Sequence, residues 1–342
     1  MEPNVAIIIL NWNGWRDTVE CLESVYQIKY PNYNIIVVDN GSEDESIEKI
    51  KDYTKGELII TSDFFKYNHL NKPIKLFEYT KEETNLIKEL KKEYYELFPH
   101  KKLILIKNDN NYGFAEGNNI GIKYALNILN ADYLLLLNND TTVDKYFLNE
   151  LIEVAETNEY IGILGPTIYD YNCGNKIQSA GTNLKWKKGI GIKFRYNEID
   201  NGTFEKIIEF DYVSGCAILI KDDVFKKIGY LNKNYFAYWE ETDFCIRANN
   251  VGYKVVSIPK SKIWHKELTS TKKISGFHEY LLTRNMFWFM KKYSTNLQYL
   301  SFLFYFFGFR FWVLNIMYIS KKNSKALKCF YKGIKDGVVD HV

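Results

Sequence analysis

Four short apolar runs recur in the first 140 residues of the chain, and no charge interrupts any of them. They occupy residues 5–10, 35–38, 103–106 and 133–137. Runs of this kind are typical of strands buried on both faces of a parallel sheet. The segments between them carry helix signals, such as caps at Asp17 and Thr18 followed by an apolar stripe that ends before Pro31. The sequence therefore predicts an α/β fold with an open, mainly parallel sheet flanked by helices.

Polar residues follow three of these runs directly. Asn11 follows the first run, Asp39 and Asn40 follow the second, and Asn-Asn-Asp at 138–140 follows the fourth. In open parallel sheets, ligands bind beyond the carboxyl ends of the strands. We therefore expect these side chains to line one binding crevice.

Composition limits the class of protein. A chain of 342 residues can form one large α/β domain with an appendage, or two modest domains. Its 45 Lys and Arg against 42 Asp and Glu leave a charge of +3, which is too small to predict a nucleic-acid partner. The five cysteines lack CxxC spacing, which favours a reducing cytoplasm over a disulfide framework or a thiolate zinc site. Residues 5–10 lack the flanking features of a signal peptide and are predicted to be a strand.

The turn at 138–140 offers hard oxygen ligands. An Asp carboxylate and an Asn amide oxygen at a strand end suit Mg²⁺ or Mn²⁺, which bind together with substrate phosphates. The alternative is an ordinary turn, since Asn and Asp are frequent turn residues.

Two further segments suit a nucleotide. Asp39 is placed to bind a base or ribose, although it could instead cap the next helix, a role that Ser42 or Asp44 could also fill. Residues 110–121 place three glycines around a helix start, where backbone N–H groups favour a diphosphate. Their spacing matches neither a dinucleotide-binding GxGxxG nor a P-loop, which argues against NAD and against P-loop ATP use.

Three carboxylates lie within four residues, at Glu240, Glu241 and Asp243. Glu241 or Glu240 could take a proton from an acceptor hydroxyl. The alternative is favourable placement of acids at a helix N-terminus. His265 ends a short predicted strand, and a lone histidine is more often structural than a metal ligand.

Six motifs in order resemble a known family. They are residues 5–14, 37–42, 111–119, 137–140, 239–247 and 264–265. Their order is similar to that of inverting family 2 glycosyltransferases, especially rhamnosyltransferase-like members, over about residues 5–290. The resemblance implies the A-type glycosyltransferase fold, with a Rossmann-like, mainly parallel central sheet and here a C-terminal helical extension.

The resemblance also implies roles for individual residues. It implies a metal site for Mg²⁺ or Mn²⁺ at Asp140, Asn138 and His265. It implies Glu241 as the catalytic base, with Glu240 and Asp243 as alternatives, and Asp243 could instead orient Arg247 or an acceptor hydroxyl. The donor nucleotide sugar would be bound by eight residues, which are Asn11, Asp39, Asn40, Asn111, Gly113, Phe114, Asn118 and Asn139.

Two positions depart from the family pattern. The usual Asp-x-Asp is Asn138-Asn139-Asp140 here, which removes one charge from the metal site. Glu241 occupies the place of the usual catalytic Asp and reaches one methylene farther.

We expect residues 1–290 to form the transferase domain. Residues 1–150 would be the nucleotide-sugar half, with a polar insertion at 61–101 that we expect to be a surface excursion, and residues 151–290 would be the acceptor half. The segment 291–342 would be an apolar and basic helical extension.

The expected activity is transfer of a sugar, with inversion, from a UDP- or dTDP-sugar to a hydroxyl of a glycan, glycolipid or glycoprotein. A sugar nucleotidyltransferase is one alternative, although residues 11–16 match its glycine-rich loop poorly. The other alternative is a non-catalytic, membrane-docked scaffold of the same fold.

Residues 297–320 are apolar and aromatic enough to span a bilayer as a helix. Arg310 at mid-span and flanking lysines equally suit a helix in the interface plane. The remaining alternative is a helix that is buried or faces an oligomer partner. The expected location is the cytoplasm, with peripheral contact to the inner face of the cell membrane as an open possibility.

Overall fold

The computed structural model describes residues 2–90, 92–266 and 276–339. Its strands are β1 Val5–Asn11, β2 Tyr33–Asp39, β3 Lys75–Thr80, β4 Lys102–Lys107, β5 Tyr133–Asn138, β6 Thr141–Val143, β7 Ile161–Asp170, β8 Ile177–Ser179, β9 Thr182–Lys185, β10 Ile190–Lys193, β11 Ile208–Glu209, β12 Ala217–Lys221 and β13 Lys254–His265. Its α-helices are α1 Trp15–Val25, α2 Ser46–Lys55, α3 Lys81–Leu86, α4 Lys92–Glu96, α5 Gly113–Asn127, α6 Phe147–Ala155, α7 Asp222–Ile228, α8 Glu240–Asn250, α9 Phe277–Tyr293, α10 Asn296–Tyr305, α11 Phe311–Ser320 and α12 Ser324–Val339.

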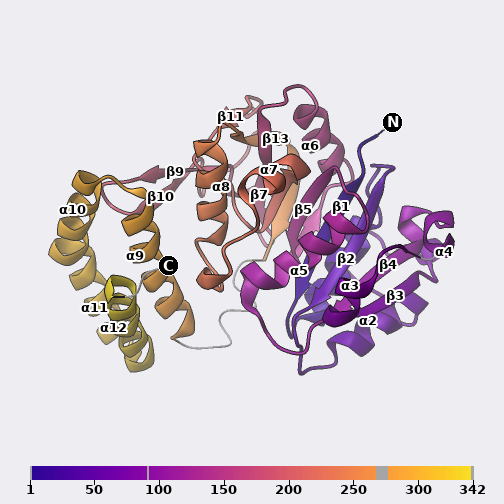
Figure 1. Ribbon diagram of the computed structural model, residues 1–342, viewed down its shortest axis with the longest axis horizontal. Helices are drawn as coiled ribbons and strands as arrows, with labels where there is room; N and C mark the ends of the chain where they lie inside the picture. The colour runs from indigo at the N-terminus through magenta and orange to yellow at the C-terminus, as the bar shows by residue number, and fades with distance from the viewer. Residues whose placement is uncertain (1, 91, 267–275, 340–342) are drawn as a thin grey trace.

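One large twisted sheet forms the centre of the molecule (Figure 1). Its strand order is β11-β13-β7-β12-β5-β1-β2-β4-β3, with β6 paired to β13 and β8 paired to β7. The strands from β5 through β1, β2 and β4 to β3 are parallel, while β12 runs antiparallel between β5 and β7. The predicted mainly parallel α/β sheet is therefore confirmed.

The register of the central strands aligns their polar ends. Asn11 on β1 lies opposite Asp39 on β2, and Leu10 lies opposite Asn138 on β5. Because parallel strands end at the same edge, three polar strand ends meet there. The predicted site residues on β1, β2 and β5 therefore lie at the same edge of the sheet.

Helices cover both faces of the sheet. Alternate residues of β1 divide between two cores, with Val5, Ile7 and Ile9 in one and Ala6 and Ile8 in the other. The first core includes residues of α1, α2 and α6, and the second includes residues of α5, α7 and α8. This two-sided burial explains why the strands read as uninterrupted apolar runs.

Residues 61–101 are not simply a surface excursion. They contribute β3, which pairs in parallel with β4 at the edge of the sheet, and they bury Phe77 and Tyr94. The Tyr94 hydroxyl donates to Asn34 Oδ1 at 2.6 Å. The expectation was wrong because an edge strand with only one buried side chain, Phe77, carries too little apolar signal.

The C-terminal helices α9 to α12 form a bundle at one end of the molecule, beside α8 (Figure 1). Its core is aromatic and includes Phe287, Phe302, Phe306 and Phe330, all fully buried. The expected boundary at 290–291 falls inside α9. Helix α10, a π-helical turn at Phe306–Arg310 and α11 form one continuous helix from Asn296 to Ser320.

Among the described residues, this helix alone has the length and apolar composition needed to cross a membrane. Only 17% of its most apolar window is buried within the chain. The alternative of a helix buried inside this chain is therefore wrong.

Candidate functional site

The ends of β1 and β2 are joined by a buried polar cluster. Asn11 Nδ2 donates to Asp39 Oδ1 at 2.7 Å, and the Ser42 hydroxyl donates to the same oxygen at 2.6 Å. The Ser42 amide donates to Asp39 Oδ2 at 3.0 Å. Asp39 therefore orders the turn that follows β2. It does not cap α2, which begins at Ser46 with Glu45 as its cap residue.

A second polar network holds the loop before α5. Asn40 Nδ2 donates to Asn111 Oδ1 at 2.9 Å and to the Gly113 carbonyl at 3.1 Å. Asn108 Nδ2 donates to Asn40 Oδ1 at 3.0 Å. Gly113 begins α5 with φ of +79°, and a Cβ there would lie 2.6 Å from the Phe236 carbonyl oxygen. Glycine is required at this position because both the backbone and the space exclude a side chain.

Three of the expected donor residues, Gly113, Phe114 and Asn118, lie within α5 itself. Asn118 is buried, and its Nδ2 donates to the Phe114 carbonyl at 2.9 Å, one turn earlier in the helix. Phe114 is partly exposed. Helix α5 begins at Gly113, inside the predicted segment 110–121, so its N-terminus lies beside the polar network.

Asn139 connects the turn after β5 to the cluster on β1. Its Nδ2 donates to Thr18 Oγ1 at 3.0 Å, and the Thr18 hydroxyl donates to Asn11 Oδ1 at 2.8 Å. This arrangement ties the Asn138–Asp140 turn to the start of α1.

Asp140 and His265 come together although 125 positions separate them in the chain. His265 Nε2 lies 3.2 Å from Asp140 Oδ1, because β13 pairs with β6 and sets His265 opposite Thr141. His265 Nδ1 lies 2.7 Å from Gln178 Oε1, which as an acceptor requires the proton on Nδ1. Nε2, which faces Asp140, is then the ring nitrogen that could bind a metal ion, as in other metal-binding imidazoles.

These residues fit a divalent metal. A carboxylate and an oriented imidazole are suitable ligands for Mn²⁺ or Mg²⁺. No three His, Cys, Asp or Glu side chains gather into a metal cluster in the described ranges, so this protein would supply few ligands. Such ions commonly complete their coordination with water and substrate phosphates. Asn138, the third predicted ligand, ends β5 with a partly exposed side chain.

Lys266 fixes the segment that follows His265. Its amide donates to the Asp140 carbonyl at 3.0 Å, and its Nζ donates to Asp17 at 2.7 Å and to Glu20 at 2.5 Å on α1. The two carboxylates raise the pKa of the Lys266 ammonium although partial burial acts against them, so this lysine stays charged.

Glu240 and Glu241 begin α8 and are the carboxylates with raised pKa values in this region. Burial raises the pKa of Glu240, and the neighbouring Glu241 raises it further. Burial also raises the pKa of Glu241, against opposing backbone hydrogen bonds. Within the described residues, one carboxylate oxygen of each is buried without a hydrogen-bond partner. A carboxylate held this way is a stronger base than an exposed one.

Asp243 is engaged differently. It accepts from Arg247 Nε at 2.7 Å, from the Tyr293 hydroxyl at 2.6 Å and from Lys292 Nζ at 3.2 Å. Asp243 thus makes the contact with Arg247 that the predicted alternative requires. Three donors on one fully buried carboxylate leave it poorly placed to remove a proton from a substrate.

Glu241 lies close to the Asn138–Asp140 turn. Its side chain approaches Gly215, where an added Cβ would lie 3.3 Å from it. The adjacent Cys216 carbonyl accepts from the Asn138 amide at 2.8 Å. The N-terminus of α8 and the end of β5 therefore border the same space.

The backbone before Glu240 is strained, and the sequence reasoning missed what holds it. Phe236, Tyr238 and Trp239 all have positive φ, between 65° and 74°. The fully buried Asn285 of α9 donates through Nδ2 to three carbonyls, those of Tyr235, Ala237 and Tyr238, at 2.8–3.0 Å. Strain of this kind persists where surrounding contacts enforce it, and it is common at functional sites.

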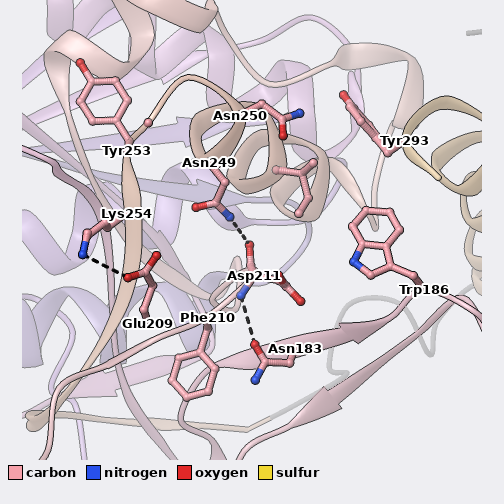
Figure 2. Close-up of a pocket in the computed structure, with 12 residues that line it drawn as sticks. Asn183, Trp186, Glu209, Phe210, Asp211, Asn249, Asn250, Tyr253, Lys254 and Tyr293 are labelled. Atoms are coloured by element: carbon pink, nitrogen blue, oxygen red, sulfur yellow. Dashed lines mark hydrogen bonds and ion pairs between the residues drawn. The ribbon is translucent and has the colours of Figure 1, made fainter. Parts of the chain in front are cut away.

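A separate open cleft of about 690 Å³ lies at the other end of α8. Figure 2 shows Asn249 and Asn183 hydrogen bonded to the backbone of Asp211, and Lys254 paired with Glu209. Trp186 and Tyr293 line its other side (Figure 2). None of the predicted site residues lines this cleft, since it lies at the C-terminal end of the helix that Glu240 begins.

The model of the family described as Glycosyl transferase family 2 matches residues 6–73 and 81–229. The low-salt glycan biosynthesis hexosyltransferase Agl10 of Haloferax volcanii is 29% identical over 189 residues, covering 55% of this chain and 60% of that protein. The dTDP-rhamnosyl transferase RfbF of Shigella flexneri is 26% identical over 199 residues, covering 56% and 64%. The chain thus spans less than two thirds of the length of these relatives.

Solved structures support the fold. TarS 1–349 of S. aureus in complex with UDP-GlcNAc superposes with a TM-score of 0.54 at 13% identity, covering 97% of this chain and 81% of that one. The mannosyltransferase PcManGT from Pyrobaculum calidifontis, in complex with GDP-Man and Mn²⁺, gives a TM-score of 0.52 at 12% identity, covering 100% and 77%. At these identities the likeness concerns the fold, and it confirms the predicted A-type glycosyltransferase architecture.

The family model covers well over half of the chain. The predicted resemblance is confirmed, and the protein belongs to glycosyl transferase family 2, with rhamnosyltransferase-like relatives.

Proposed function

We propose that the protein transfers a sugar from a nucleoside-diphosphate sugar to an acceptor hydroxyl, with inversion at the anomeric carbon. One observation carries this proposal: the ends of β1, β2 and β5, the His265 end of β13 and the N-terminus of α8 all border one edge of the sheet. Ligands of open α/β sheets bind at such an edge.

The donor would lie across the strand ends. In this proposal the nucleoside contacts Asn11, Asp39 and Asn40, which are already ordered by buried hydrogen bonds. The diphosphate lies near the N-terminus of α5, which Gly113 leaves open for close approach. A UDP- or dTDP-sugar suits this arrangement, and the dTDP donor of the RfbF relative supports the second.

Asp140 and His265 would hold Mn²⁺ or Mg²⁺, with Asn138 beside them. The ion would neutralise charge on the departing nucleoside diphosphate. The Gln178 contact keeps the His265 imidazole in the tautomer that such an ion needs.

Glu241 would accept the proton of the acceptor hydroxyl as that oxygen attacks the anomeric carbon. Its raised pKa and its place beside the Asn138 turn support this role over that of Asp243, whose carboxylate is already held by three donors. Glu240 is more deeply buried and remains the alternative base. The single displacement requires no covalent glycosyl-enzyme intermediate.

The acceptor would be a growing glycan or a lipid-linked glycan at the cytoplasmic face of the membrane. The glycan-biosynthesis name of the Agl10 relative and the exposed apolar helix Asn296–Ser320 support this setting. If the protein were a sugar nucleotidyltransferase or a non-catalytic scaffold, the donor-release experiment would give a different product or none.

The test is a panel of nucleotide sugars incubated with the purified full chain, Mn²⁺ or Mg²⁺ and membrane lipids. Release of nucleoside diphosphate is followed with and without chelator. We expect release from one donor, loss with chelator, and loss of roughly a hundredfold or more in Asp140→Ala. The matched control is Asp223→Ala, which removes an exposed carboxylate on α7. No turnover of any donor would favour the scaffold, and pyrophosphate release would favour the nucleotidyltransferase.

A further inference from the structure

The helix from Asn296 to Ser320 has two apolar sides. One side is buried in the C-terminal bundle, where Phe302 and Phe306 pack on Phe287 with ring centroids 5.2 and 4.8 Å apart. The other side faces outward and is also apolar. We call six of its residues the apolar stripe, which consists of Leu297, Leu300, Phe304, Trp312, Ile316 and Ile319, with 51% to 75% of each exposed.

The π-helical turn keeps this stripe on one side. The spacing of 297, 300 and 304 follows the three-and-four pattern of an α-helical face, as does that of 312, 316 and 319. An unbroken α-helix would carry the face from 304 to 311, because two turns contain about seven residues. The turn at Phe306–Arg310 adds one residue, so the face continues at Trp312, and Phe311 turns toward the core. The two halves of the helix therefore expose a single surface.

The charge around this surface has one sign. Residues 276–339 contain ten Lys and Arg against two Asp and Glu, although the whole chain carries only +3. Lys321 and Lys322 end the helix, and Lys325 and Lys328 follow on α12, all exposed. An apolar face bordered by lysines is typical of a segment that docks on an anionic lipid surface.

The packing of the bundle determines how the helix meets the bilayer. Its buried side lies against α12, where Tyr331 donates to the buried Asn315 at 2.6 Å. Helix α12 also exposes Lys325, Lys328, Lys332 and Lys335. A transmembrane orientation would carry these lysines into the hydrocarbon at a cost of about 3 kcal/mol each. A helix lying in the plane of the interface avoids that cost.

We propose that the apolar stripe lies in the plane of an anionic phospholipid surface and docks the enzyme there without spanning it. A second copy of this chain is a poorer occupant, since a symmetric dimer would bring two strongly basic bundles together. The inference rests on the proposed function only because a lipid-linked acceptor would give membrane docking a purpose. Its test measures vesicle binding and does not depend on turnover.

The experiment measures sedimentation of the full chain with vesicles of phosphatidylcholine alone or mixed with phosphatidylglycerol. The variant is Phe304→Ser with Trp312→Ser and Ile316→Ser. The control is Ile59→Ser with Leu70→Ser and Leu86→Ser, which removes three equally exposed apolar side chains far from the bundle. Light scattering reports oligomeric state, and donor turnover on a soluble acceptor reports the active site.

We expect the native chain and the control to bind the anionic vesicles. Salt should weaken this binding, and alkaline carbonate should release the protein from the vesicles. We expect the stripe variant to bind at least ~10-fold more weakly with turnover on the soluble acceptor retained. Equal binding of the stripe variant, resistance to carbonate, or a dimer lost in the stripe variant would each overturn the proposal. Absent turnover with intact vesicle binding would instead contradict the proposed function alone.

Discussion

At the scale of single residues, the site contains two kinds of carboxylate. Some accept several hydrogen bonds, and others have a buried oxygen with no hydrogen-bond partner among the described residues. Asp39 and Asp243 accept hydrogen bonds or ion pairs from several donors, whereas Glu240 and Glu241 each keep a buried carboxylate oxygen without a partner in the described structure. Unsatisfied buried carboxylates are costly, and they are typical of positions where chemistry requires them.

Replacing Glu241 with Gln tests the base. We expect kcat to fall by about 10²–10⁴ with little change in the donor KM, because Gln preserves the shape of Glu but cannot accept the proton. Steady-state kinetics on the donor found in the panel measure this. A matching loss in Glu240→Gln instead, with Glu241→Gln near normal, would assign the base to Glu240.

Glu241 is also expected to determine the acid limb of the pH dependence of kcat. Burial raises the pKa of Glu241, so this carboxyl stays protonated to a higher pH than an exposed Glu. Activity is therefore expected to fall as pH decreases through that raised value, and the limb should disappear from the residual activity of Glu241→Gln. A kcat limb at the ordinary pH of an exposed Glu would contradict this assignment.

Gln178 is expected to act as a positioning residue for the metal site. Gln178→Leu removes the acceptor for His265 Nδ1, and we expect Mn²⁺ affinity to fall about 10–100-fold. Titration of Mn²⁺ followed by electron paramagnetic resonance measures this without turnover. Gln178→Glu retains an acceptor and should bind Mn²⁺ at least as well as the native chain, whereas unchanged affinity in Gln178→Leu would exclude the role.

At the scale of elements, α9 connects the bundle to the segment that precedes α8. Asn285 holds three carbonyls of that segment, and Lys292 and Tyr293 reach Asp243 in the first turn of α8. The C-terminal bundle thus contributes directly to the position of the proposed base.

Replacing Asn285 with Leu tests this connection. Loss of three buried hydrogen bonds should lower the free energy of unfolding by about 2–4 kcal/mol and also reduce kcat, since the strained backbone before Glu240 loses its support. Asn315→Leu is the control, because it removes a buried Asn from α11 in the same bundle. We expect the control to lose stability and keep kcat in the folded fraction. Equal kcat losses in both variants would argue for general destabilisation.

The π-helical turn has its own test. Gly308 is exposed, and a Cβ added to it would meet no atom within 4 Å. Deleting this residue should restore an α-helical turn. Trp312 would then follow Phe304 by seven residues, or about two α-helical turns, so the two halves of the apolar stripe would stay on one side. Vesicle binding should therefore be retained after the deletion, whereas inserting one Ala after Gly308 should rotate the halves by about 100° and lower binding severalfold. Unchanged binding after the insertion would show that the aligned stripe is not needed.

At the scale of the whole molecule, the central fold could be predicted from the sequence and the long-range contacts could not. The runs at 5–10, 35–38 and 133–137 are buried on both faces, so the pattern alone identified parallel strands. The polar residues at their ends were equally readable, because strand ends share an edge.

Other features had no local signal. Strand β3 is buried at a single position, and its apolar residues are mixed with Lys75, Glu78 and Thr80. Gln178 meets His265 across 87 positions, and Asn285 meets residues 235–238 across 47 to 50 positions. A lone Gln or Asn carries no periodicity that would reveal such a partner. The π-helical turn could not be predicted either. Its effect is to align the exposed residues of the two half-helices, and this is visible only once the buried side of the helix is known.

The contacts of α9 bear on how this enzyme can be made soluble for study. Removing the apolar C-terminal region is the obvious route, but a chain ending before α9 loses Asn285, Lys292 and Tyr293 together. We expect such a chain to bind nucleotide by calorimetry and to show no detectable turnover. Substituting the outward-facing side chains while retaining the helices should instead give an active enzyme that needs no detergent, so purification here is better served by changing a surface than by shortening the chain.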